Sequence, residues 1–243
     1  MKTTYLAFLL AIARTITAHE VWHRLIVNGT VSEPWQYVRD VDREFGDEYS
    51  DYSGYNKMTP NFDMYDLTIR CGRNASKYGP TTDIATVVAG TEIGFSIRTY
   101  DDKGLTHPGP ILAYMSRAPE GMDLREYEGE GEWWKVAELG AKDSKNWYST
   151  WLNEWNFTIP RTTPPGDYLL RVEQVWPTMF PDYIQFFTNC AQVRIVGEGG
   201  GKPGPTVRFP GGYQVGGKGL VHTQQTNDDI TKYEMPGPEL WTG

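Results

Sequence analysis

The sequence is poor in the features that mark nucleic-acid-binding and membrane proteins. Lysine and arginine number 23 against 31 acidic residues, which gives a net charge of −8. Nucleic-acid-binding proteins need a cationic surface, so this balance argues against that class, whereas a neutral polymer such as a polysaccharide is compatible with it. Beyond the first eighteen residues no apolar run reaches the ~20 residues of a membrane-spanning helix. We therefore expect neither a nucleic-acid partner nor a membrane partner.

The N-terminus has the pattern of a secretory signal peptide. Lys2 is followed by an apolar run over residues 5–13 and then by small residues up to Ala18. A membrane anchor is the alternative, but the run is too short to span a bilayer. We predict that residues 1–18 are removed and that residues 19–243 form one domain of a secreted, extracellular and monomeric protein.

Cysteine is almost absent, with Cys71 and Cys190 as the two residues of this type. In a secreted chain an even count favours a disulfide, and two buried free thiols are the alternative. Such a bridge would close a loop of about 120 residues and stabilise the fold by roughly 4–5 kcal/mol in the chain-entropy model. The sequons at Asn28, Asn74 and Asn156 permit N-glycosylation.

Helical periodicity is scarce, and alternation of apolar and polar residues dominates instead. Short alternating runs separated by Gly/Pro turns predict an all-β fold, an antiparallel β-sandwich of the immunoglobulin/fibronectin-like kind with long loops. We expect a turn or two of helix within residues 122–139 and a long surface loop over residues 37–66. The alternating runs are residues 23–27, 92–100, 111–115, 167–175 and 190–196.

The chain after Gly197 is rich in glycine and proline. Disorder is one interpretation, but the aromatic residues Phe209, Tyr213, Tyr233 and Trp241 favour a tail that packs on the domain. No Ser/Thr-rich linker follows the sandwich, so we expect no separate carbohydrate-binding module.

Histidine is also rare, with four in the chain, and two of them suggest a metal site. Cleavage after Ala18 would give His19 a free α-amine beside its imidazole, and His107 could add a third nitrogen. Neutral imidazole and amine nitrogens suit copper, and affinity should fall in acid because the α-amine has a reference pKa near 8. The alternative for His107 is a turn residue before proline, and we expect His23 and His222 to be structural or solvated.

Ordered sequence blocks then point to a family. The sequence resembles the fungal lytic polysaccharide monooxygenases of auxiliary activity family 9, formerly glycoside hydrolase family 61, from His19 to the C-terminus. The blocks are Trp35-Gln36-Tyr37-Val38-Arg39, Arg70-Cys71, residues 107–115 (HPGPILAYM), 166–173 (GDYLLRVE), 185–192 (QFFTNCAQ), 209–213 (FPGGY) and 233–238 (YEMPGP).

This resemblance implies a β-sandwich whose flat face holds one copper ion. His19 and His107 would be the ligands, Gln185 would orient the oxygen species, and Cys71 and Cys190 match the disulfide of the family. Tyr213 matches an aromatic that contacts cellulose, although packing on the core is the alternative. The implied reaction is oxidative cleavage of cellulose or a related β-glucan at C1, C4 or both, with an external electron donor and O2 or H2O2.

Two departures from the family pattern bear on catalysis. Phe187 occupies the place of an axial tyrosine and would shield that side of the copper, and residues 174–180 lack a histidine that commonly supports the oxygen species. Groups around metal ligands typically change affinity or activity by roughly 10–100-fold. The alternative is therefore a weakly active or non-catalytic protein that binds copper or polysaccharide. A hydrolytic glycosidase needs two facing carboxylates, and nothing singles out a pair among the 31 acidic residues.

Overall fold

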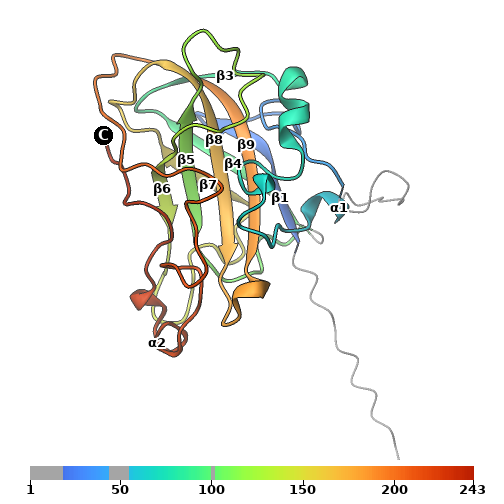
Figure 1. The fold of residues 1–243 in the computed structure, drawn as a ribbon, viewed down its shortest axis with the longest axis vertical. Helices are drawn as coiled ribbons and strands as arrows, with labels where there is room; N and C mark the ends of the chain where they lie inside the picture. Colours follow the sequence, from blue (N-terminus) through green and yellow to red (C-terminus); the bar gives the residue numbers. More distant parts are fainter. Residues whose placement is uncertain (1–18, 44–54, 100–101) are drawn as a thin grey trace, which may run out of the picture.

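Two β-sheets pack face to face in the computed structural model, which describes residues 19–43, 55–99 and 102–243 (Figure 1). The predicted β-sandwich is confirmed. One sheet has the strand order β2-β1-β4-β7 and the other has the order β3-β9-β8-β5-β6. The strands are β1 (Glu20–Val27), β2 (Thr30–Val31), β3 (Ala85–Val88), β4 (Glu92–Thr99), β5 (Ile111–Arg117), β6 (Trp134–Leu139), β7 (Glu154–Thr158), β8 (Gly166–Trp176) and β9 (Gln185–Val196).

Helical elements are short and lie in the connections. They are α1 (Tyr55–Met58), η1 (Leu67–Ile69), η2 (Ala75–Thr81), η3 (Pro181–Tyr183), α2 (Gln224–Asp228) and η4 (Ile230–Lys232). None of the helices in the described segments is long and apolar enough to cross a membrane. The predicted signal peptide and residues 44–54 of the predicted long loop lie outside the described residues.

The five-stranded sheet is buried on both faces along β5 and β8, whereas its edge strand β3 has exposed residues. Its inner face joins the other sheet in one core, to which Ile111, Ala113 and Met115 of β5 contribute. Its outer face supports a second core, to which Leu112 and Tyr114 of the same strand contribute. Strands covered on both faces lose the apolar/polar alternation of a half-exposed strand, so β5 and β8 appear as nearly continuous buried runs.

The C-terminal tail covers the second core, as the aromatic residues of the tail predict. Phe209 and Tyr213 are buried in this core, and Trp241 packs into the core between the sheets. No strand follows β9 in the described residues. The tail is therefore a structural cover for the sheet.

One expectation about local structure is wrong. The predicted helical turns within residues 122–139 are absent from this described segment, which ends in β6, and neighbouring Trp133 and Trp134 face different cores as successive strand residues do. The pairs between the named strands are antiparallel as expected, except that β3 pairs with β9 in parallel. That pair lies at the edge of the five-stranded sheet.

Candidate metal centre

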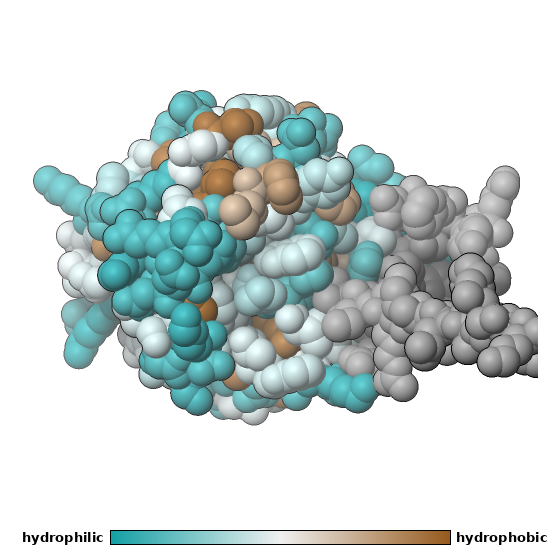
Figure 2. Space-filling model, turned by 90° about the horizontal axis from the view of Figure 1, so that it is seen from below, coloured by the Kyte–Doolittle hydropathy of each residue, from teal (hydrophilic) through white to brown (hydrophobic). Residues whose placement is uncertain are grey.

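Several connections meet at the end of the sandwich where β8 ends and β9 begins. Trp176 pairs with Gln185 across these two strands, and Gln174 pairs with Ile111 at the start of β5. The loop before β5 therefore lies beside the β8–β9 connection at the lower end of Figure 1. Figure 2 views this end and shows apolar side chains grouped within a largely hydrophilic surface.

His19 directly precedes β1, which is fastened to β9 at this end. The anchor is the fully buried Trp22, whose backbone N–H donates to Asn189 Oδ1 at 3.0 Å. Its indole Nε1–H donates to the carbonyl oxygen of Phe187 at 3.2 Å. The chain that follows His19 is thereby bonded to the strand segment that contains Phe187.

His107 lies in the loop between β4 and β5 and contacts the same segment. Its carbonyl oxygen accepts a hydrogen bond from Gln174 Nε2 at 2.7 Å. Its imidazole stacks on the indole of Trp176 with ring centroids 4.0 Å apart and planes inclined by 17°. The centroid of the Phe187 ring lies 5.6 Å from that of His107. Two aromatic rings from β8 and β9 therefore fix the plane of this imidazole.

Two further residues border this cluster. Gln185, predicted to orient the oxygen species, begins β9 and pairs with Trp176. Glu20, the neighbour of His19, is 3% exposed and lines a cavity of about 10 Å³ together with Phe187. Burial raises the pKa of the Glu20 carboxyl well above its usual range, and its Oε1 has no hydrogen-bond partner among the described residues. The interior behind the cluster therefore favours a neutral carboxylic acid.

Trp176 is the contact of His107 that the sequence did not identify. It belongs to residues 174–180, which contain no histidine, and the structure places its ring against the predicted ligand. An indole stacked on an imidazole supplies packing and orientation in place of a side-chain hydrogen bond. The available signal was a tryptophan directly after the alternating run of residues 167–175, but its partner His107 lies 69 positions earlier in the sequence.

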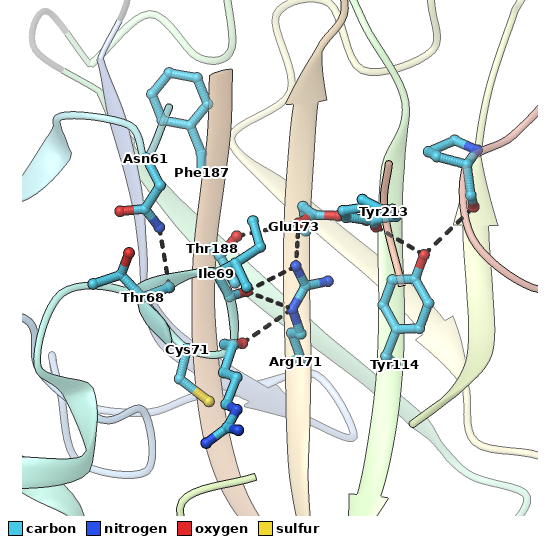
Figure 3. Close-up of polar contacts among 12 residues, drawn as sticks. Asn61, Thr68, Ile69, Cys71, Tyr114, Arg171, Glu173, Phe187, Thr188 and Tyr213 are labelled. Atoms are coloured by element: carbon cyan, nitrogen blue, oxygen red, sulfur yellow. Dashed lines mark hydrogen bonds and ion pairs between the residues drawn. The ribbon is translucent and has the colours of Figure 1, made fainter. Parts of the chain in front are cut away.

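The prediction that Tyr213 binds substrate is wrong, because this side chain is 2% exposed. Its hydroxyl donates to Glu173 and lies 3.0 Å from the hydroxyl of Tyr114. Figure 3 shows Glu173 between Tyr213 and Arg171, to which the carboxylate is also paired. Both charged groups are fully buried, so Tyr213 completes a buried polar network and presents no ring face to a polysaccharide. The alternative of packing on the core is the correct one.

Cys71 and Cys190 form the predicted disulfide, with their Cα atoms 4.9 Å apart. Cys71 follows η1 and Cys190 lies within β9, so the bridge joins the segment that covers the second core to the centre of the five-stranded sheet. The two cysteines are 119 positions apart in the sequence, and β3 to β8 lie between them.

The three sequons differ in accessibility. Asn28 is exposed in the tight turn between β1 and β2. Asn74 is exposed, but its Nδ2 donates to Asp42 Oδ2 at 2.8 Å. Asn156 lies in β7 with a partly buried side chain, and its Oδ1 is inaccessible and has no hydrogen-bond partner in the described chain. Glycosylation at all three stays a prediction, and Asn28 offers the least obstructed amide.

Comparison with known proteins identifies the family and agrees with the fold. The model of Auxiliary Activity family 9, formerly GH61, matches residues 19–233. The chain is 40% identical over 260 residues to the AA9 family lytic polysaccharide monooxygenase U of Thermothielavioides terrestris, with 100% of both chains covered. It is 37% identical over 249 residues to monooxygenase C of Emericella nidulans, again with 100% of both covered.

Solved structures of this kind share the fold. The extended catalytic domain of H. jecorina LPMO9A superposes with a TM-score of 0.74 at 22% identity, covering 93% of this chain and 92% of the other. The crystal structure of HiLPMO9B gives a TM-score of 0.73 at 23% identity and covers 93% of this chain and 100% of the other. The fold is therefore that of the lytic polysaccharide monooxygenases. The chain belongs to Auxiliary Activity family 9.

Proposed function

We propose that the protein is a secreted, copper-dependent lytic polysaccharide monooxygenase that cleaves cellulose or a related β-glucan at C1, C4 or both. Removal of residues 1–18 would make His19 the first residue, and its α-amine and imidazole would bind one copper ion together with His107. Family membership supports the reaction class. The observation that carries the metal site is the contact of His107 with Phe187, since the Phe187 carbonyl also anchors β1 through Trp22.

The donor set suits copper. Two neutral imidazoles and one amine are nitrogen donors of the kind that this metal prefers. In the described parts of the chain no three His, Cys, Asp or Glu side chains gather into a metal-binding group. The proposed set does not require such a group, because the α-amine of His19 supplies the third nitrogen.

The side chains around the nitrogen donors would have different roles. Copper held there would supply one-electron chemistry towards O2 or H2O2, with electrons from an external donor. Trp176 and Phe187 would keep the His107 ring in one plane, so that its donor nitrogen has a fixed direction. Gln185 would offer its amide to the oxygen co-substrate. Phe187 would exclude water beside the His107 ring without donating a hydrogen bond.

A polysaccharide substrate is supported by the exposed aromatic residues, which lie in three loops. Asn61 joins the first loop to the start of β9 through two hydrogen bonds of 2.9 Å with Phe186. The other two loops follow β6 and β8, which end beside the start of β5. Aromatic rings offer apolar faces to the C–H faces of sugar rings. The exposed aromatic residues in the described chain are Phe62, Tyr65, Tyr148, Trp151, Phe180 and Tyr183.

An extended N-terminus tests the metal site. Copper titration by calorimetry should give at least about tenfold weaker binding when one glycine precedes His19, because the amine then moves away from the imidazole. His107→Ala should weaken binding as well. One glycine added after Gly243 is the matched control and should leave the affinity unchanged. Equal copper affinity with and without the N-terminal glycine would refute the assignment of His19.

A protein that binds copper or polysaccharide but turns over poorly is the second candidate. Two observations favour it: Phe187 has no phenol, and residues 174–180 contain no histidine that could support the oxygen species. Tight copper binding without release of oxidised oligosaccharides from cellulose or other glucans would support this candidate over the enzyme.

A further inference from the structure

Trp151 combines an unusual backbone with high exposure. Its φ is +67°, in the left-handed region that bulky residues rarely occupy, and 60% of its surface is exposed. A tryptophan that has an unfavourable backbone conformation and does not pack in a core contributes little to the stability of the fold. Strained conformations of this kind persist where the surroundings impose them and are frequent at functional sites.

The surroundings that impose this conformation belong to the loop of His107. The backbone N–H of Trp151 donates to Leu105 O at 2.8 Å, and Leu105 N–H donates to Leu152 O at 2.9 Å. The hydroxyl of Ser149 donates to Gly109 O at 2.6 Å. These hydrogen bonds lie on both sides of His107 in the sequence, so the loop that carries Trp151 is fastened to the loop that carries the proposed ligand.

Other residues of the same loop pack in the interior and hold the loop in place. Trp147 is buried and meets Tyr233 edge-on with ring centroids 4.9 Å apart. Tyr148 is 51% exposed and adds a second aromatic side chain to the same loop. Residues 146–153 contain no charged side chain in a protein that carries a net charge of −8. The surface composition thus suits an uncharged ligand that has apolar faces.

We propose that Trp151, assisted by Tyr148, is a binding platform for a β-1,4-glucan chain beside His107. The indole would stack on a pyranose ring, and its fixed distance from His107 would determine which part of the chain reaches the metal. This inference rests on the proposed function, because it specifies how the substrate of that site is held. Trp151 would then position the substrate without contacting the reacting atoms.

Binding to phosphoric-acid-swollen cellulose tests the platform, with chelator-treated protein so that metal chemistry does not contribute. Trp151→Gly should bind at least about fivefold more weakly, as expected for an exposed aromatic anchor. Glycine adopts a positive φ without strain, so the melting temperature of this variant should equal or exceed that of the wild type. Trp151→Phe retains a ring and should keep affinity within about twofold.

Val88→Ala is the matched control, because Val88 is an exposed apolar residue that pairs with Val196 at the other end of β9. It should change neither binding nor melting temperature. Wild-type affinity in Trp151→Gly would overturn the proposal, and so would a lowered melting temperature that accounts for the loss of binding. A protein that binds in this pattern but yields no oxidised products would contradict the proposed enzymatic function alone.

Discussion

Tyr213 faces inward because a buried carboxylate needs its hydroxyl. Glu173 and Arg171 are both fully buried, and such a pair needs most of its remaining donors and acceptors satisfied. Arg171 Nη1 has no hydrogen-bond partner among the described residues, but the guanidinium lies over the ring of Phe209 at 4.3 Å. Tyr213 and Thr188 donate to the two oxygens of Glu173, while Arg171 also donates to the carbonyl of Ile69. Burial raises the pKa of Tyr213 well above its usual value, so the phenol stays protonated and remains a donor.

Tyr213→Phe should therefore lower stability and spare substrate binding. Loss of the hydroxyl leaves Glu173 short of one hydrogen bond in a buried site, which typically costs about 1–3 kcal/mol. Urea unfolding measures this loss, and cellulose binding should stay at the wild-type level. Trp151→Gly is the complementary control, since it should alter binding without lowering stability. Reduced cellulose binding by a fully folded Tyr213→Phe would restore Tyr213 as a substrate contact.

Among the strands, β1 has a shift in its pairing register at His23. Trp22 pairs with Ile97 and Arg24 with Ser96, so His23 is the additional residue of a bulge. Its side chain is 9% exposed, and its Nδ1 lacks a hydrogen-bond partner among the described residues. Burial lowers the pKa of His23 to about 4, and the nearby charge of Arg24 acts in the same direction. The fold therefore holds this histidine neutral.

Stability should consequently fall as the pH drops below the usual pKa of histidine. Arg98 also lowers the pKa of His23, whereas Asp102 and the Ser96 backbone raise it. The unfolded chain takes up the proton near pH 6.5 and the folded chain near pH 4, so stability is lost between these values. His23 should contribute about 2 kcal/mol of loss between about pH 6.5 and pH 4.5. Urea unfolding of the wild type and His23→Gln at both pH values measures it, and identical pH dependence would contradict it.

The alternating runs of the sequence predict β4, β5, β8 and part of β9, whereas β6 lies where helical turns were expected. Residues 92–100 and 190–196 alternate and correspond to β4 and to part of β9. Helical turns were expected within residues 122–139, and one reason that this prediction failed is that the adjacent Trp133 and Trp134 do not resemble an alternating strand. Each packs in a different core, and the second core exists because the tail folds back over the sheet. The packing of the tail on the sheet depends on contacts between distant residues, so no local sequence pattern predicts it.

For the whole molecule, the metal donors stay a prediction from the sequence, and the surroundings of His107 were not predicted. His19 and His107 follow from the cleavage motif and from family resemblance. The stack of His107 on Trp176 and the fastening of Trp151 to the His107 loop depend on how distant loops meet at one end of the sandwich. Burial of Tyr213 likewise decides against a substrate contact. From the sequence, a substrate contact and packing on the core were equally favoured for this residue.

The most direct test of the account uses protein that begins at His19, is loaded with copper, and is incubated with cellulose, ascorbate and hydrogen peroxide. Mass spectrometry of the soluble fraction should detect oligosaccharides oxidised at C1, C4 or both, and these should disappear with His107→Ala. Such products would show that Phe187 and Trp176 are compatible with turnover. Tight copper binding with no oxidised products from cellulose, xyloglucan or other β-glucans would contradict the assignment of this chain as an active monooxygenase.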